Sequence, residues 1–207
     1  MALDLGHHRA GVLQLASLPP LALYVHLPWC LRKCPYCDFN SHEKRPDAAL
    51  QRQYVGALVS DLETALPSIW GRQVSSIFIG GGTPSLFEPA VVDELLAAVR
   101  ARLNVEPGCE ITLEANPGSF ERDRFAAFRA AGVTRLSMGV QSFDDAALLA
   151  LGRVHNSAQA HEALDEAARC FSTFNIDIMY ALPRQSLEGL RRDLHAALAY
   201  KPPHVSI

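Results

Sequence analysis

Three cysteines lie close together near the start of the chain, separated by three and then two residues: Cys30, Cys34 and Cys37. A structural zinc site normally has four ligands from two such pairs, and the sequence has no second pair of this kind. Three thiolates on one tight loop suit three irons of a [4Fe-4S] cube, whose fourth iron stays open to another ligand. The spacing therefore predicts a [4Fe-4S] site with one open position. The alternative is a zinc site completed by His26 or His42.

The other two cysteines, Cys109 and Cys170, stand apart from this group. Cys109 begins an apolar run and Cys170 ends an amphipathic segment, so both are expected to be small buried side chains. An odd total of five cysteines argues against a disulfide framework.

Polar and glycine residues follow several of the apolar runs. The run ending at Ile79 continues as Gly80-Gly81-Gly82-Thr83-Pro84, where glycines permit a close backbone approach to a ligand or simply form a tight turn. No Gly-Lys-Ser/Thr follows, so this is not a Walker phosphate loop. Glu114 and Gln141 end the next two runs and are expected at the functional edge of a parallel sheet.

Asp177 lies between Ile176 and Ile178 in an apolar run, where an unpaired carboxylate would be costly. Arg153 or a bound ligand would relieve that cost. Three histidines, His26, His42 and His155, flank these motifs, although a lone loop histidine is more often a hydrogen-bonding residue than a ligand.

Apolar segments of two kinds alternate along the chain. Short runs typical of β-strands cover residues 21–27, 76–79, 110–113, 135–140, 175–180 and 204–207. Segments with helical spacing cover residues 46–66, 89–103, 122–131, 142–152, 157–171 and 186–200. Ser142 with Asp145, Ser157 and Ser186 are expected to cap the last three helices, and Gly132 to end the third.

This alternation predicts an α/β fold with a parallel sheet, as an open doubly wound sheet or an incomplete barrel. We expect one domain over residues 21–207, preceded by a flexible extension over residues 1–20. The last strand has no helix to cover it, which predicts that the chain is part of a longer protein.

Composition excludes several classes of protein. Of 207 residues, 49% are hydrophobic and 20% charged, which excludes intrinsic disorder. A net charge of −3 gives no broad basic surface for nucleic acid. The sequence has no apolar run long enough for a membrane span, and its first residues resemble neither a secretory signal nor a transit peptide. We therefore expect a cytoplasmic protein.

Seven ordered motifs between Leu21 and the last residue resemble the radical S-adenosylmethionine (SAM) superfamily. Within it, the chain looks like the oxygen-independent coproporphyrinogen III oxidases and the related heme chaperones of the HemW branch. The motifs are YVHLPWC, KCPYCDFNS, IFIGGGTPS, LEANPG, GVQSF, LGRVH and NIDIMYALP.

The resemblance implies a partial (β/α)6 barrel, here truncated at the sixth strand, without the C-terminal region of the family. It also implies that the amino and carboxylate groups of SAM chelate the open iron, and that Gly82 and Thr83 hold its methionine end. The other positions that match SAM or cluster contacts in the family are Tyr24, Tyr36, Glu114, Gln141, Arg153 and Asp177.

Two functions remain open within this group. The oxidases have a fourth cysteine two places after the third, and Phe39 occupies that place here. This substitution favours a heme chaperone that binds a [4Fe-4S] cluster with SAM and transfers heme to an acceptor; the alternative is oxidative decarboxylation of coproporphyrinogen III. The resemblance implies as partners heme or porphyrin, an electron donor such as flavodoxin or ferredoxin, and a heme-acceptor protein, with membrane contact only through that acceptor.

Overall fold

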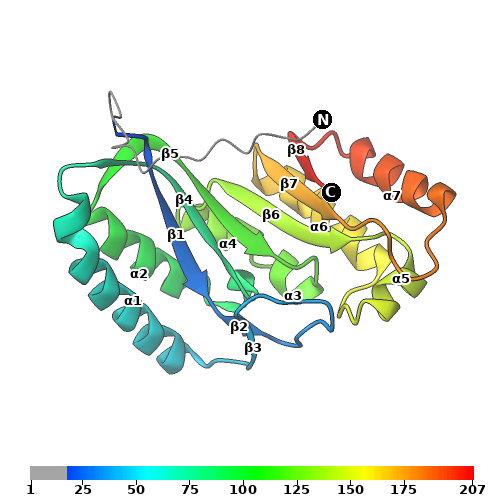
Figure 1. The fold of residues 1–207 in the computed structure, drawn as a ribbon, viewed down its shortest axis with the longest axis horizontal. Coiled ribbons are helices and arrows are strands. Elements are labelled where there is room, and N and C mark those ends of the chain that lie inside the picture. Colours follow the sequence, from blue (N-terminus) through cyan, green and yellow to red (C-terminus); the bar gives the residue numbers. More distant parts are fainter. Residues whose placement is uncertain (1–17) are drawn as a thin grey trace, which may run out of the picture.

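Six parallel strands form one curved sheet, and a segment containing at least one helix joins each strand to the next (Figure 1). The computed structural model describes residues 18–207, so most of the predicted N-terminal extension lies outside the described residues. The strands are β1 (Leu21–Leu27), β4 (Gln73–Gly81), β5 (Asn104–Ala115), β6 (Arg135–Gln141), β7 (Phe174–Ile178) and β8 (His204–Ser206).

The spatial order of these strands is β1-β4-β5-β6-β7-β8, which is also their order along the chain. A doubly wound sheet reverses direction at a switch point, whereas a barrel adds each new strand on the same side. The strand order is therefore that of a barrel and not that of a doubly wound sheet. Within residues 18–207 the two end strands, β1 and β8, each pair on one side only, so the barrel is partial.

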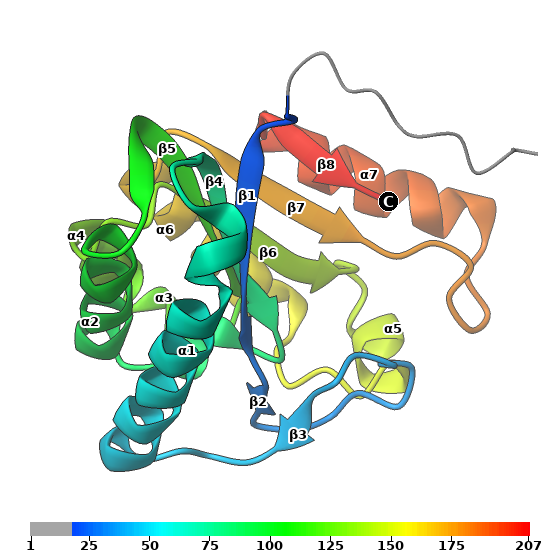
Figure 2. The same cartoon turned by 60° about the vertical axis from the view of Figure 1, so that its left-hand side comes forward.

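Helices cover one face of this sheet, as Figure 2 shows for α1, α2, α4 and α6. A separate ribbon of two short strands, β2 (Trp29–Cys30) and β3 (His42–Glu43), was not predicted and encloses the loop that carries Cys34 and Cys37. The helices are α1 (Ala48–Ile69), α2 (Pro89–Arg100), α3 (Ser119–Arg122), α4 (Phe125–Ala130), α5 (Asp145–Ala150), α6 (Ser157–Cys170) and α7 (Leu187–Ala199), with a 3-10 turn η1 (Pro84–Leu86).

Each long strand has one apolar and one polar face. In β5, Ile111 and Leu113 belong to the hydrophobic core under the helices, whereas Glu114 faces the other side. In β7, Ile176 is fully buried in the same core and Asp177 faces away from it. The helices are therefore held by the outer face, and the inner face is left for polar side chains.

One predicted helix, over residues 122–131, is interrupted, because α3 ends at Arg122 and α4 begins at Phe125. The amide of Arg124 bonds to the carbonyl of Glu121, only three residues back, and this closes a turn between the two helices. Phe125 and Phe128 are both fully buried, which fixes α4 as a separate helix. Gly132 follows with a φ of 103°, as predicted for the residue after a helix.

Two of the three predicted N-caps are wrong. Helix α6 is capped by Asn156, whose side chain accepts from Gln159 N at 2.9 Å, rather than by Ser157. Helix α5 is capped by Asp144 instead of Ser142, because the Ser142 hydroxyl donates to the buried Asp193 on α7. The third prediction is confirmed, since Ser186 Oγ accepts from Gly189 N at 3.0 Å.

The two cysteines outside the cysteine cluster differ in burial. Cys109 is buried as predicted, but Cys170 is only partly buried, and its thiol lies 3.2 Å from the Glu166 carboxylate at the end of α6. Among residues 18–207, no helix combines the length and the apolar character that crossing a membrane requires.

Candidate functional site

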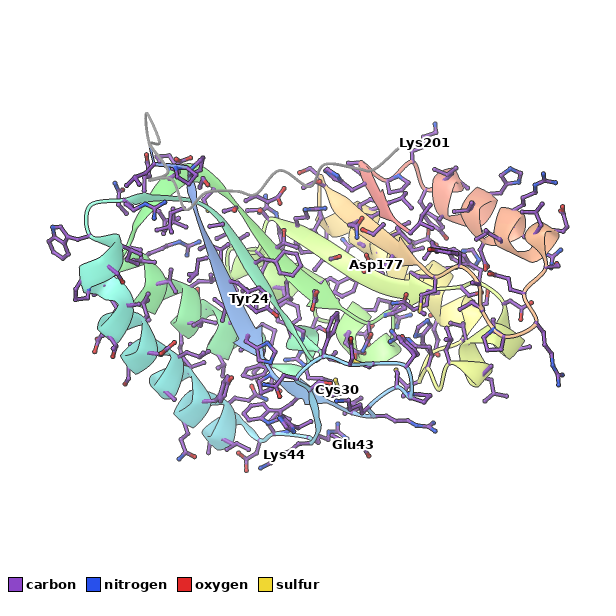
Figure 3. All side chains as sticks on the ribbon, in the orientation of Figure 1. Tyr24, Cys30, Glu43, Lys44, Asp177 and Lys201 are labelled. Atoms are coloured by element: carbon purple, nitrogen blue, oxygen red, sulfur yellow. The ribbon has the colours of Figure 1, made fainter. Side chains whose placement is uncertain are left out.

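A pocket lies at the carboxyl ends of the central strands, where the loop between β1 and α1 folds over the sheet. Residues 28–42, here called the cysteine loop, contribute Cys30, Cys34 and Cys37 to its wall. Figure 3 shows Cys30 beyond the end of β1 and Asp177 on β7. The strand ends and following loops contribute Gly82, Thr83, Glu114, Asn116, Ser137, Gly139, Gln141, Arg153 and Asp177.

The cysteine loop is held at several points by hydrogen bonds. Lys33 Nζ donates to the carbonyls of Phe39 and Ser41, at 3.0 and 3.2 Å. His26 Nε2 lies 2.8 Å from the carbonyl of Asn40, which can only accept, so Nε2 carries the proton. The loop is therefore closed by contacts with its own backbone and with β1.

The zinc alternative finds little support in this arrangement. Both ring nitrogens of His26 are engaged, because Nδ1 lies 3.2 Å from the Tyr24 hydroxyl. His42 is exposed on β3.

Each cysteine sulfur has one polar side chain at hydrogen-bonding distance. Cys30 Sγ accepts from the Thr83 hydroxyl at 3.6 Å, and Cys34 Sγ accepts from Arg153 at 3.7 Å. Cys37 Sγ lies 3.8 Å from the hydroxyl of Ser41. Hydrogen bonds to ligand sulfurs are one means by which proteins tune an iron–sulfur cluster. Three sulfurs on one wall of a pocket, each with such a partner, fit the ligand set of a [4Fe-4S] cube.

The glycine segment after β4 lies directly against the cysteine loop. The amides of Gly82 and Thr83 donate to the carbonyls of Leu27 and Trp29, both at 2.8 Å. A Cβ at Gly82 would lie 2.7 Å from the Trp29 carbonyl oxygen, closer than such atoms approach. The close backbone approach predicted here is therefore present, but the chain's own cysteine loop makes it, so glycine is required whether or not a ligand is bound.

Arg153, in the loop between α5 and α6, binds several groups across the pocket. Its guanidinium donates to the carbonyl of Gly139 at 2.7 Å and to the side-chain oxygen of Asn116. It also lies 3.4 Å from the Tyr36 hydroxyl, besides the contact with Cys34. Arg153 thus connects the sheet to the cysteine loop.

The suggestion that Arg153 neutralises Asp177 is wrong, because both terminal nitrogens of the guanidinium bond to these other groups. Asp177 instead accepts from Asn175 Nδ2 at 2.6 Å and from Ser137 Oγ at 3.4 Å. Burial raises the pKa of Asp177, and its hydrogen bonds to Asn175, Ser206 and Ser137 oppose that rise. The hydrogen-bonding partners of this carboxylate are neutral groups, and the nearby charge of Arg135 also opposes the rise in its pKa.

Glu114 is the second partly buried carboxylate of the inner face. Burial is the main reason that its pKa is raised, and the nearby charge of Asp177 raises it further. The amide of Gly81 donates to Glu114 Oε2 at 3.0 Å and opposes this rise. Two carboxylates with raised pKa values therefore face one pocket from neighbouring parts of the sheet.

Gln141, at the end of β6, has a strained backbone. Its φ is 70°, in the left-handed region that non-glycine residues rarely adopt, and its carbonyl accepts from Met179 N at 2.9 Å. The pairing of β6 with β7 also shifts register between Gly139 and Gln141. Strain and bulges of this kind are enriched at functional sites, where they re-aim a side chain.

Of the eight side chains predicted to bind the cofactor, seven line this pocket and Tyr24 does not. Tyr24 lies on the edge strand β1 and is 56% exposed, with its hydroxyl toward His26. Tyr36 lines the pocket, and burial raises its pKa. The structure thus groups residues from three strands, β5, β6 and β7, and from three loops, and it leaves Tyr24 at the edge.

Three polar residues of the site were missed in the sequence: Asn116, Ser137 and Ser41. Asn116 follows Glu114 at the end of β5, so the rule that selected Glu114 also applied to it. Ser137 and Gln141 are separated by an even number of residues in β6, so they share its inner face. This spacing could have identified Ser137 once the strand was predicted. No local pattern marks Ser41.

His155 is the other histidine near the site, and it is buried behind β6 rather than in the lining of the pocket. Its Nε2 lies 3.2 Å from the carbonyl of Val140. Burial, with the nearby charge of Arg153, lowers the pKa of His155 to about 4, so it is neutral at physiological pH. Its role here is to hold the loop that carries Arg153.

Comparison with known proteins places this geometry in context. The profile of the radical SAM superfamily matches residues 24–197. The chain is 47% identical to the heme chaperone HemW of Haemophilus influenzae and 48% identical to that of Escherichia coli, in each case over 93% of this chain and 51% of the relative. The chain thus spans about half the length of these relatives.

The fold is also similar to a solved structure. Coproporphyrinogen III oxidase (HemN) from Escherichia coli, described as a radical SAM enzyme, superposes with a TM-score of 0.80 at 31% sequence identity. The similarity covers 90% of this chain and 44% of that protein.

Proposed function

The chain belongs to the radical SAM superfamily, and on that basis we propose that it acts as a heme chaperone, which binds a [4Fe-4S] cluster with SAM and transfers heme to an acceptor protein. The superfamily implies the cluster and SAM. Heme binding and transfer are proposed from the similarity to proteins named heme chaperone HemW.

Cys30, Cys34 and Cys37 are the proposed ligands of the cluster. Their sulfurs share one wall of the pocket, and each has a hydrogen-bonding side chain beside it. The chemistry that these cofactors supply when bound is one-electron reductive cleavage of the SAM sulfonium. The protein contributes by orienting the cofactors and by limiting the access of water.

The remaining proposed contacts would hold SAM beside the cluster. Gly82 and Thr83 would hold the methionine end of SAM, as the resemblance implies, because they lie against the cysteine loop. Glu114 and Asp177 offer carboxylate acceptors to polar groups of SAM, and Gln141 offers a side-chain amide. The full proposed set is Tyr36, Gly82, Thr83, Glu114, Gln141, Arg153 and Asp177, which line the pocket, together with Tyr24, which lies outside the lining.

The observation that carries the choice of a chaperone is Phe39. In the oxidases this position is a fourth cysteine, and here it is an apolar side chain that is 61% exposed beside the pocket. A phenyl ring has no thiol with which to bind metal, donate a proton or undergo redox chemistry. An exposed aromatic ring at the mouth of a pocket suits contact with a flat apolar ligand such as a porphyrin.

The second candidate is an oxygen-independent coproporphyrinogen III oxidase. It is supported by the structural similarity to HemN at a TM-score of 0.80. In either case the proposed partners are heme or a porphyrin and an electron donor such as flavodoxin or ferredoxin. A heme-acceptor protein is required by the chaperone alone. A cytoplasmic location stays a prediction.

Anaerobic incubation of the purified protein with SAM, a reductant and either heme or coproporphyrinogen III tests the choice. We expect a stoichiometric heme complex, seen in the absorption spectrum, and no decarboxylated porphyrin by mass spectrometry. Decarboxylated product that disappears in Cys34→Ala would establish the oxidase and reject the chaperone. Absence of both heme binding and turnover would reject the two proposals together.

A further inference from the structure

A continuous path of hydrogen bonds joins Cys30 to Cys34 through three side chains. Thr83 Oγ1 donates to Cys30 Sγ at 3.6 Å and accepts from Asn116 Nδ2 at 3.0 Å. Asn116 Oδ1 accepts from Arg153, which also donates to Cys34 Sγ at 3.7 Å. The path leaves the cysteine loop at Cys30, passes through residues at the strand ends, and returns to the loop at Cys34.

The direction of every bond in this path follows from the chemistry of Arg153. A guanidinium has donors only, so the side-chain oxygen of Asn116 must face it. The amide nitrogen of Asn116 then faces Thr83 and donates to its oxygen. A hydroxyl has a single proton, and because the amide already donates to Thr83, that proton is free to point toward Cys30.

From this we propose that Asn116 is a positioning residue for the cluster, which orients the Thr83 hydroxyl so that it donates to the sulfur of Cys30. The inference rests on the proposed ligation of the cluster by the three cysteines. Asn116 lies apart from the sulfurs itself and acts through Thr83.

Burial makes this orientation matter. Thr83 is 5% exposed, so solvent has little access to replace the amide or to compete for the hydroxyl proton. A hydrogen bond to a ligand sulfur stabilises the more negative, reduced cluster and so raises its reduction potential. Asn116 is therefore expected to raise the potential, although it touches no ligand.

Cys37 provides an internal control. Its hydrogen-bonding partner, Ser41, lies 3.8 Å from the sulfur and is not a member of the hydrogen-bonded path through Thr83 and Asn116. Removal of the Ser41 hydroxyl should also lower the potential, but independently of Asn116.

The test is a double-mutant cycle on anaerobically reconstituted protein, with the midpoint potential measured by redox titration and electron paramagnetic resonance. We expect Asn116→Ala and Thr83→Val each to shift the potential downward. The Asn116→Ala shift should fall by at least about half in the Thr83→Val background but stay unchanged in Ser41→Ala. Thr83→Ser, which keeps the hydroxyl, should restore most of the potential.

Equal shifts by Asn116→Ala in both the Thr83→Val and parent backgrounds would overturn the inference, as would an unshifted potential in Thr83→Val. Asn116→Asp gives a second measurement if the Asn116→Ala variant fails to bind the cluster. Its carboxylate accepts from Arg153 and also from Thr83, which turns the hydroxyl proton away from Cys30, so Thr83→Val should then add little.

Loss of the cluster from both Asn116 variants but not from Thr83→Val would also contradict the inference, because Asn116 would then act on assembly. Failure of the parent protein to bind any cluster is a different result. It would reject the proposed function. Iron and sulfide analysis of the parent protein measures cluster binding directly and so distinguishes this result.

Discussion

The two faces of the sheet differ sharply, although the same strands form both. On the outer face, Leu113, Leu136 and Ile176 are fully buried under the helices. On the inner face, Glu114 and Asp177 are carboxylates whose pKa values burial raises. Stability and chemistry are thus assigned to alternate residues, and a shift of one position along a strand exchanges the two roles.

The two faces also differ in how favourable their burial is for folding. The outer face has the apolar packing expected of a core, whereas the inner face keeps partly desolvated charges that an apolar side chain would avoid. Polar groups at such positions destabilise the apoprotein and make the pocket suitable for a charged ligand. Changes on the outer face should therefore reduce stability, and changes at the pocket should alter binding.

The largest effect is expected at the cysteine loop. Cys34→Ala should abolish the cluster, because a cube needs three protein ligands and the pocket offers no replacement thiol among the described residues. Iron and sulfide should fall to background and the visible absorption should disappear. Cys170→Ser is the matched control: it changes a cysteine away from the pocket and should keep full iron content. Full iron in Cys34→Ala would refute the ligand assignment.

The second largest effect is a loss of stability, which we expect for a substitution on the outer face. Leu113→Ala removes a side chain that is 0% exposed, and such substitutions cost about 2–5 kcal/mol of the free energy of unfolding. Chemical denaturation of the apoprotein measures the change. Ser137→Ala, on the inner face, should cost only about 1–2 kcal/mol, since it removes one hydrogen bond to Asp177 and one from Asn175. Equal losses in the two variants would contradict the division between the faces.

The smallest effect is a pH dependence that originates on the inner face. Burial raises the pKa of Glu114 in the folded state, so this group favours folding below its unfolded pKa. That contribution is lost as the pH rises through the folded value. The free energy of unfolding of Glu114→Gln should therefore decline less than that of the parent between about pH 4 and pH 8. Asp177 still titrates in this variant, so the decline is reduced and not abolished.

Denaturation of the apoprotein across this pH range measures the difference. Asp61→Asn, at an exposed position on α1, is the control and should leave the pH profile unchanged. A profile for Glu114→Gln that coincides with the parent would show that burial of this carboxylate has no net effect on folding.

Much of this architecture is visible in the sequence. The six strands and the helices between them are predicted by short-range periodicity, which depends only on neighbouring residues. The cysteine loop is recognisable for the same reason, since its three thiols lie within eight residues. The superfamily resemblance is a property of ordered motifs and requires no coordinates. Position at strand ends selected Glu114 and Gln141, whereas Tyr36, Gly82 and Thr83 were assigned by the resemblance.

Other features depended on residues far apart in the chain. The choice between a barrel and a doubly wound sheet is decided by strand order, which alternation alone leaves open. Arg153 binds Asn116, 37 positions away, instead of Asp177, and Ser142 serves Asp193 instead of capping its own helix. Hydrogen-bond partners are chosen by distance and direction in space. Only the curvature of the sheet and its register bring Cys30, Thr83, Asn116 and Arg153 together, because they come from four separate segments of the chain.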